Sequence, residues 1–429
     1  MGSVAGLISL PSRDDGAHYD VTGYHPGSAA MSTPVGGGVF VWDAGRDKAD
    51  HNGGTVIDPD KSFPADWSVD ADVAAWFAPG ASGTGCFVRK VQPVLSTRMF
   101  GAFCDYTKDD ARAVKQCVNQ SGVDGWPSEV EAPAGSFINQ TVVVSRPVHF
   151  IGTRYTYDNP TFVNETNTDL LMFQVRAHNV KFSSCVIKGP GKEVGTAKGI
   201  EVGEAGGSAV WDSFVFDDAS VVFNYKTGLE INTQNFLITG YAGASTCDTG
   251  ISLVGLASAV DRRNGYFNEA SFHSCNVGLK ATGSWRALNF NGCMASFCKE
   301  TWLFDDLINS LIVGNDIANI DGDGIRIDSA GSVTVTGNTI TSTSTGISTT
   351  GRGISIAGQH CTVGQNVVGS TYGHGIEVVG NVNTVQGNTV INADNRASGL
   401  YDGINQRQCK RSRRQYIPAV FGWSYTLRH

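Results

Sequence analysis

The chain has 429 residues, a net charge of −8 and only 17% charged residues, with 53 glycines but 13 prolines. An apolar content of 41% excludes a disordered chain, and the acidic balance argues against a nucleic-acid partner. No run of 18 apolar residues and no basic, apolar leader is present, so neither membrane insertion nor a secretory signal is expected. The ten cysteines include no CxxC pair, which favours reduced thiols, and no metal or cofactor is predicted.

Residues 1–95 predict a small β-rich module. The strings PVGGGVFVWDAG (34–45) and DHNGGTVIDP (50–59) place short strands at Val39, Val41, Val56 and Ile57, between glycine turns. The aspartates and histidines of this region lie in turn-like contexts and indicate no catalytic group.

Residues 96–176 predict one helix followed by the first strands of a longer β-structure. Thr107 and Asp110 fit a capping box with Asp in place of Glu. The apolar stripe of this helix is Ala111, Val114, Cys117 and Val118. The alternating string TVVVSRPVHFIG (141–152) predicts a strand, so the helix is expected to cap an exposed sheet end.

Residues 177–405 repeat, and the repeat predicts the fold class. A Gly-apolar-x-apolar tetrad recurs every 22–29 residues, a period typical of solenoids. Leucine is too sparse for leucine-rich repeats, and no helical pattern lies between the strands. The prediction is therefore an all-β, right-handed parallel β-helix. The tetrads are GIEV (199), GLEI (228), GISL (250), GLKA (278), TWLF (301), GIRI (324), GISI (353), GIEV (375) and GINQ (403).

A second column supports this register. Asn315, Asn338, Asn366 and Asn388 each end a four-residue run such as VTGN, which predicts side chains stacked along the axis. Aligned to the same turn in earlier coils are Cys185, Tyr241, Cys275 and Cys293. Cysteines at a stacked turn are interpreted as structural.

A family resemblance rests on two segments. GAFCDYTKDDARAVKQCVN (101–119) followed by EAPAGSFINQTVVVSRPVHFIG (131–152) resembles the first part of pectate-lyase-like proteins, which typically reads FGAxGDGxxDDxxAIxxAI before a PxGxY strand. Cys104 and Tyr106 stand where glycine is usual. The strings GGGVFVWD and NGGTVIDP resemble the lead-in modules of bacteriophage tailspikes and capsule depolymerases. The matching residues are Gly101, Ala102, Asp105, Asp109, Asp110, Ala113, Pro133, Ala134, Gly135 and Phe137.

The resemblance implies a homotrimeric virion protein of the phage tail, attached through residues 1–95 to tail or baseplate proteins. It implies recognition of bacterial surface polysaccharide, either capsule or lipopolysaccharide, at the host cell surface. The same fold hosts hydrolases, lyases, esterases and non-catalytic fibres. Three functions therefore remain open: a polysaccharide depolymerase, a structural or receptor-binding tail fibre without catalysis, or a free bacterial pectinase-like enzyme. The N-terminal module and the lack of an expected secretory signal disfavour the third.

The candidate site follows from strand geometry. The third residue of each tetrad points outward, so residues two positions later, such as Asp305 and Asp328, are also outward and lie on adjacent rungs. Glu201 and Glu230 form a second adjacent pair. Glycosidases need two carboxyl groups at about 5–5.5 Å or about 6.5–9.5 Å, and a lyase needs a base beside a cation. These four acids are the candidate catalytic residues, with a solvated surface role as the alternative.

Three further residues are candidates for binding the substrate. Lys280 and Arg326 flank the aspartates with positive charge, and Trp302 offers a ring for stacking, with a core position as its alternative. The string DIANIDGDG (316–324) has an incomplete calcium-loop signature and is interpreted as a turn. Residues 406–429 leave the repeat, and their basic and aromatic residues predict a C-terminal cap.

Overall fold

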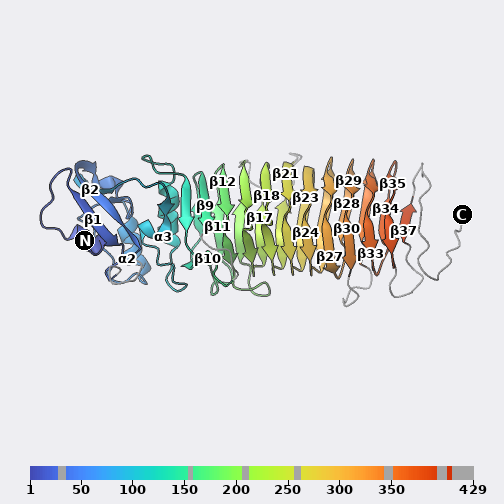
Figure 1. Ribbon diagram of the computed structural model, residues 1–429, viewed down its shortest axis with the longest axis horizontal. Coiled ribbons are helices and arrows are strands. Elements are labelled where there is room, and N and C mark those ends of the chain that lie inside the picture. Colours follow the sequence, from blue (N-terminus) through green and yellow to red (C-terminus); the bar gives the residue numbers. More distant parts are fainter. Residues whose placement is uncertain are drawn as a thin grey trace. The chain divides into compact units, whose positions relative to one another are not determined.

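The structure is a computed structural model that describes residues 1–27, 35–152, 158–204, 212–255, 262–342, 351–393 and 403–407. Two compact units are present. The N-terminal unit comprises Met1–Pro190, Val194–Glu201 and Ala219–Val221. The C-terminal unit comprises Gly191–Glu193, Val202–Asp218 and the chain from Val222 onward. Figure 1 colours the first unit from blue to green and the second from green to red.

The N-terminal unit begins with a four-stranded antiparallel sheet in the order β1-β2-β4-β3. Its strands are β1 (His18–Gly23), β2 (Gly36–Asp47), β3 (Val56–Ile57) and β4 (Thr84–Arg89). The helices around it are α1 (Val4–Ile8), η2 (Lys48–Asp50), α2 (Asp70–Phe77) and η3 (Thr97–Phe100). The strands predicted around Val39 and Val56 are confirmed.

A buried arginine holds this module together. Arg89 is 1% exposed, and its guanidinium lies 4.4 Å from the ring centre of Phe40. Its side chain donates hydrogen bonds to the backbone carbonyls of Gly36, Gly37, Gly54 and Met99. Burial lowers the pKa of Arg89 to about 10, so the group stays charged at neutral pH. A buried cation is tolerated here because backbone carbonyl dipoles replace water.

The predicted helix is α3 (Ala111–Gln120), and the four residues of its predicted stripe are buried. It packs against β8 (Val142–Val144). The predicted capping box, in which Thr107 and Asp110 cap the helix, is wrong. Asp110 is itself the N-cap residue, and its carboxylate accepts the N–H groups of Phe103 and Cys104 instead of capping the helix. The preceding turn takes this carboxylate because its two N–H groups need an acceptor.

Two positions where pectate-lyase-like proteins typically have glycine have the backbone conformation that glycine would adopt. Cys104 has φ 53° and Tyr106 has φ 67°, both in the left-handed region that disfavours side chains. The N–H of Tyr106 donates to the carbonyl of Gly135, which holds the turn against the following strands. The turn is therefore retained although its glycines are replaced.

The remaining strands of the N-terminal unit are short and parallel, with each strand paired to one in the next coil. One series is β5 (Leu95–Ser96), β6 (Glu129–Ala132), β8, β9 (Val148–Gly152), β11 (Leu171–Val175), β12 (Val180–Ser183) and β14 (Lys198–Val202). The other series is β7 (Ser136–Phe137), β10 (Phe162–Val163) and β13 (Val186–Lys188).

The C-terminal unit is built from coils with three strand faces. The tetrad face is β17 (Thr227–Ile231), β20 (Thr249–Val254), the first part of β23 (Val277–Asn291), β25 (Glu300–Ile308), β28 (Ile325–Gly331), β31 (Ile354–Gln359), β34 (Ile376–Val379) and β37 (Ile404–Arg407). Consecutive strands pair in parallel and start at or next to the tetrads. The predicted parallel β-helix is confirmed.

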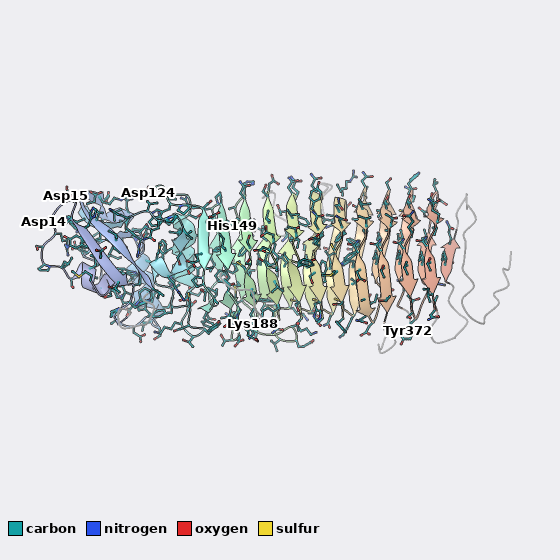
Figure 2. The ribbon with its side chains drawn as sticks, in the orientation of Figure 1. Asp14, Asp15, Asp124, His149, Lys188 and Tyr372 are labelled. Carbon is teal, nitrogen blue, oxygen red and sulfur yellow. The ribbon has the colours of Figure 1, made fainter. Side chains whose placement is uncertain are left out.

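The other two faces complete each coil. The second face is β15 (Phe214–Asp217), β18 (Phe236–Thr239), β21 (Arg262–Asn268), the second part of β23, β26 (Leu311–Val313), β29 (Thr334–Thr336), β32 (Thr362–Gly364) and β35 (Thr384–Gln386). The third face is β16 (Val221–Phe223), β19 (Gly243–Ser245), β22 (Ser271–His273), β24 (Met294–Ser296), β27 (Asp316–Ile320), β30 (Thr339–Ser342), β33 (Val367–Gly369) and β36 (Thr389–Ile391). Side chains project outward along these coils (Figure 2).

The predicted asparagine ladder is confirmed inside the C-terminal unit. Asn315 donates through Nδ2 to Oδ1 of Asn338 at 2.8 Å, and Asn338 and Asn366 repeat this bond to the next coil at 2.9 Å. Cys293 heads the ladder, because its N–H donates to Oδ1 of Asn315. Cys275 does not belong to it. Its coil stacks instead with that of Cys247 at another corner, through backbone bonds.

Candidate functional site

The outward column predicted from the tetrads exists along the C-terminal unit. Its members occupy directly paired positions on successive strands of the tetrad face. They are Glu230, Ser252, Lys280, Leu303, Arg326, Ser355, Glu377 and Asn405. Because parallel strands lie about 4.8 Å apart, these side chains form an evenly spaced track, which we call the outward column.

Asp305 and Asp328 lie beside this column on neighbouring strands. Phe304 pairs with Ile327 in an unshifted register, so the next residues face each other. Both aspartates are exposed. Asp305 accepts a 3.3 Å hydrogen bond from the N–H of Gly283.

Asp328 is not a free carboxylate. Arg326 donates to both of its oxygens at 3.0 Å, and this hydrogen bonding raises the pKa of Arg326. The predicted cation therefore neutralises one of the predicted acids. Lys280, two strands earlier, is exposed on the same column.

Trp302 does not reach the surface, so its predicted stacking role is wrong. Its side chain is 0% exposed and its ring lies 4.9 Å from the ring of Phe290 in the core. The alternation that turns Leu303 outward turns Trp302 inward. Trp285 is buried as well, and Trp211 lies outside the described residues.

Glu201 belongs to the N-terminal unit and is held in ion pairs. Arg176 donates to Oε1, and Lys198 lies 3.5 Å from Oε2. Burial by itself would raise the pKa of Glu201, but the hydrogen bond from Arg176 and the charge of Lys198 lower it below its usual range. An acid that stays ionised is a poor proton donor. In the C-terminal unit, Glu230 accepts a 3.4 Å hydrogen bond from Asn232.

A second polar group, which the sequence analysis did not identify, connects four coils. The N–H of Asp323 donates to Oε2 of Glu300 at 2.7 Å, and the N–H of Arg352 donates to Oδ1 of Asp323 at 2.8 Å. The guanidinium of Arg352 also bonds Asp323 at 2.6 Å and Glu377 at 3.0 Å. We call Glu300, Asp323, Arg352 and Glu377 the Arg352 cluster.

The carboxyl groups of this cluster have different electrostatic surroundings. Burial raises the pKa of Glu300; the N–H of Asp323 opposes this shift, and the nearby charge of Asp323 adds to it. Asp323 and Glu377 are instead paired with Arg352, whose own pKa is raised chiefly by the hydrogen bond to Asp323. A carboxyl group whose pKa is raised by burial, next to a carboxylate that is paired with an arginine, resembles the pair of unlike carboxyl groups that glycosidic-bond hydrolysis uses.

A sequence signal for this cluster existed. Glu300, Asp323 and Arg352 each stand immediately before a tetrad, at 301, 324 and 353, and His374 precedes the next one. Residues at equal offsets from a repeat stack in register, so the tetrad alignment already brings them together. Asp323 was interpreted only as part of a turn, because its partner Arg352 is 29 residues away.

The described ranges contain no group of three or more His, Cys, Asp or Glu side chains arranged to hold a metal ion. No helix in those ranges is long and apolar enough to cross a membrane.

Two family models match parts of the chain. Residues 1–92 match one described as "Phage tail protein small four-stranded beta-sheet domain", in agreement with the sheet β1-β2-β4-β3. Residues 183–358 match one described as "Periplasmic copper-binding protein (NosD)". No curated protein matches the sequence.

Solved structures that are similar to this chain include several tailspike proteins. The enzymatically active domain of tailspike protein 2 of bacteriophage CBA120 is 14% identical with a TM-score of 0.63, over 94% of this chain and 61% of that one. The gp42 tailspike of Acinetobacter phage vb_AbaP_AS12 is 12% identical with a TM-score of 0.53, over 100% of this chain and 77% of that one. The gp49 tailspike of Acinetobacter baumannii bacteriophage Fri1, a capsular polysaccharide depolymerase, is 13% identical with a TM-score of 0.50, over 96% and 75%.

The extent of these matches limits what they establish. The chain spans 61% of the CBA120 domain and 50% of the full-length CBA120 tailspike protein 2. Identities of 12–14% establish the fold, which is the tailspike-type parallel β-helix.

Proposed function

We propose that this chain, which joins a phage-tail β-sheet domain to a tailspike-type parallel β-helix, is a tailspike that recognises and cleaves host-surface polysaccharide. The observation that carries the proposal is this pairing within one chain: a tail-type module in residues 1–92 and, after it, coils with an outward column of polar side chains. The module suits attachment to tail or baseplate proteins, which supports a location in the virion tail.

The outward column suits a repeating sugar chain. Its side chains recur at one strand spacing, about 4.8 Å, so a polymer lying along them meets a side chain at regular intervals. Lys280, exposed on this column, adds positive charge for an acidic polysaccharide, and the exposed Asp305 offers an acceptor for sugar hydroxyls.

Cleavage is assigned to carboxyl groups on adjacent rungs. Asp305 with Asp328 and Glu300 with Asp323 each lie on adjacent rungs, which are about 4.8 Å apart along the axis. Burial raises the pKa of Glu300, so we assign proton donation to it. Asp305 and Asp328 are retained as the second proposed pair.

A homotrimer is also proposed, formed through the third face of the C-terminal unit. Its outward residues are mostly uncharged, and three apolar ones are exposed: Met294 at 41%, Val367 at 40% and Ile391 at 37%. Contact with two further copies of the chain would remove them from water. Light scattering is expected to give three times the chain mass, and Val367→Asp is expected to lower it.

A specific observation favours a second function, a receptor-binding fibre without catalysis. Asp328, Asp323 and Glu377 are each paired with an arginine, as expected for acids that stabilise a surface. In this case the outward column binds polysaccharide and leaves it intact.

The experiment that separates the two functions uses purified surface polysaccharides from candidate hosts. New reducing ends indicate hydrolysis, absorbance of unsaturated uronates indicates a lyase, and binding without either indicates a fibre. Glu300→Gln is expected to slow cleavage by about 10²- to 10⁴-fold while binding is retained. Glu269→Gln, at an exposed glutamate between β21 and β22, is the matched control.

The variants also locate the chemistry. Full cleavage by Glu300→Gln, with loss in Asp305→Asn and Asp328→Asn, would move the site to that pair. Binding without cleavage by the wild type would establish the fibre. Absence of both binding and cleavage on every host polysaccharide would contradict the proposed function.

A further inference from the structure

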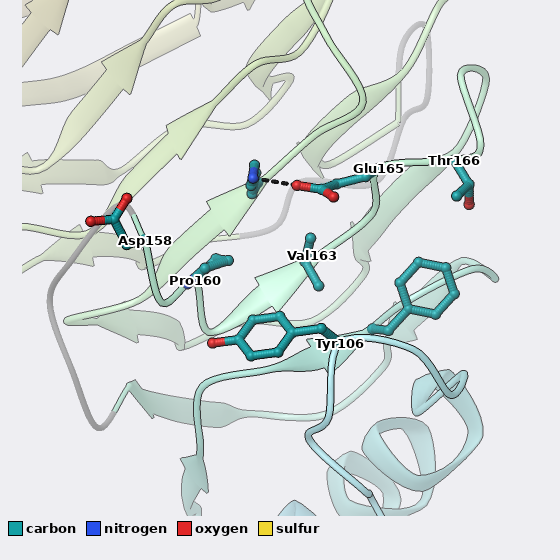
Figure 3. Close-up of a pocket in the computed structure, with 8 residues that line it drawn as sticks. Tyr106, Asp158, Pro160, Val163, Glu165 and Thr166 are labelled. Atoms are coloured by element: carbon teal, nitrogen blue, oxygen red, sulfur yellow. Dashed lines mark ion pairs between the residues drawn. The ribbon is translucent and has the colours of Figure 1, made fainter.

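The N-terminal unit contains a pocket of about 230 Å³ that none of the preceding functions uses. It lies at the first coils, and Figure 3 shows Val163 between Tyr106 and Glu165. The volume is below the range typical of pockets for drug-sized ligands, so the occupant must be small.

The floor of the pocket is part of the β-structure. Phe137, Val163 and Lys188 occupy paired positions on β7, β10 and β13. The alternation that turns Phe137 and Lys188 outward also turns Val163 outward, yet Val163 is only 3% exposed. Val163 is shielded from solvent because the segments that carry Tyr106 and Glu165 project on either side of it.

Both walls are held by hydrogen bonds. On one side the N–H of Tyr106 donates to the carbonyl of Gly135, and its hydroxyl donates to Asn159 at 3.3 Å. On the other side the buried Asn164 accepts the N–H groups of Thr166 and Asn167 at 3.2 and 2.9 Å. The turn that carries Glu165 and Thr166 is therefore fixed before any ligand arrives.

The polar groups converge above the floor. Glu165 and Lys188 form an ion pair across the pocket, drawn as a dashed line in Figure 3. Thr166 adds a hydroxyl and Asp158 a second carboxylate at the rim. The rim therefore has donors and acceptors, with two negative charges against one positive.

Tyr106 has a left-handed backbone conformation that residues with a side chain rarely adopt. It has φ 67° and is 40% exposed, so packing contacts offset little of the strain of its left-handed backbone. Glycine, usual in the family at this position, would adopt the same φ without strain. Backbone strain held at a pocket points to use of the side chain.

We propose that this pocket binds one neutral sugar ring of the polysaccharide, as a recognition site separate from the outward column. The inference rests on the proposed function, because it supplies the polysaccharide. The rings of Tyr106 and Phe137 suit the C–H face of a pyranose, and Glu165, Lys188 and Thr166 suit its hydroxyls. An acidic sugar is disfavoured because Glu165 already neutralises Lys188 and Asp158 adds negative charge.

The test is saturation-transfer NMR on the full chain with three probes: methyl glucoside, methyl galactoside and methyl glucuronide. A neutral glycoside is expected to bind the wild type. Tyr106→Gly is expected to weaken that binding about tenfold while the melting temperature is unchanged or higher. Glu165→Gln, an exposed change at the rim, is a second variant expected to weaken binding without a change in folding.

A matched control is available in the chain. Among the described residues, Tyr241 is the other tyrosine with a left-handed backbone, at φ 62°, and it is 57% exposed in the C-terminal unit. Tyr241→Gly has the same backbone effect and is expected to leave glycoside binding unchanged.

Several outcomes overturn the inference. They are no glycoside binding by the wild type, unchanged binding in both pocket variants, or preference for the glucuronide. A drop in melting temperature for Tyr106→Gly, without a change in binding, would show that the ring serves packing. Host-polysaccharide binding by the wild type, with the glycosides not bound, would leave the proposed function intact and remove only this pocket.

Discussion

The antiparallel module of the N-terminal unit and the coils of the C-terminal unit satisfy buried polar groups in different ways. In the module, Arg89 and His51 each have a unique set of partners from distant segments. In the coils, Asn315, Asn338 and Asn366 repeat one hydrogen-bond pattern from rung to rung. A unique network is sensitive to the loss of a single residue, whereas a ladder distributes its bonds over many similar ones.

The largest expected effect is in the module. Arg89→Ala removes a buried side chain and leaves four carbonyls without donors, so the free energy of unfolding should fall by about 4 kcal/mol or more. Hydrogen exchange at β2 and β4 measures the loss. Lys90→Ala, an exposed neighbour, is the control. A change under about 1 kcal/mol for Arg89→Ala would show that the module does not depend on this network.

The next effect is a pH dependence in the same module. His51 accepts the N–H of Asp58 at Nδ1 and donates through Nε2 to the carbonyl of Trp76, so no position is left for a second proton. Burial lowers the pKa of His51 to about 4, with only partial opposition from the Trp76 hydrogen bond. The unfolded chain takes up the proton near the ordinary pKa, about 6.5.

Stability is therefore fully present above pH about 6.5 and is lost as the pH falls toward about 4. The expected loss from His51 is about 3 kcal/mol in the free energy of unfolding. Denaturation of the wild type and of His51→Gln at several pH values measures it, with exposed His18→Gln as the control. Identical pH slopes for the wild type and His51→Gln would contradict the assignment.

A smaller effect is expected in the ladder. Asn338→Ala removes the acceptor for the N–H and side-chain amide of Asn315 and the donor to the carbonyl of Ile312. The free energy of unfolding should fall by about 2 kcal/mol, because neighbouring rungs keep their own bonds. Asn291→Ala, on the outside of the same unit, should have almost no effect. A loss as large as that of Arg89→Ala would remove the distinction between network and ladder.

The smallest effect is expected at the exposed ion pair of the outward column. Asp328→Asn should change the free energy of unfolding by less than about 0.5 kcal/mol, because solvent screens the pair with Arg326. Thermal melting at low and high salt measures it. A larger, salt-dependent loss would mean that the pair stabilises the coils.

The repeat allowed much of the C-terminal unit to be predicted. A tetrad every 22–29 residues and strict alternation along each strand place Leu303 and Arg326 outward and Asn338 in a stacked turn. These predictions are confirmed because the alternation depends only on spacing within a coil, and the stacking depends only on the offset between successive coils. The same alternation predicts that the side chain of Trp302 points into the core, where it lies. The predicted stacking role of Trp302 at the surface did not follow that rule. The limits predicted for the four segments of the chain remain predictions.

The sequence by itself determined the periodic features: the β-helix, its outward column and the asparagine ladder, all of which follow from local spacing. The tertiary structure decided which groups are paired. Arg352 joins Asp323 to Glu377, Arg326 neutralises Asp328, and the turn of Tyr106 encloses Val163. Side-chain pairing and pocket volume depend on how separate turns meet in space, and a turn's path is set by backbone angles such as the φ of 67° at Tyr106, which residue type alone does not specify.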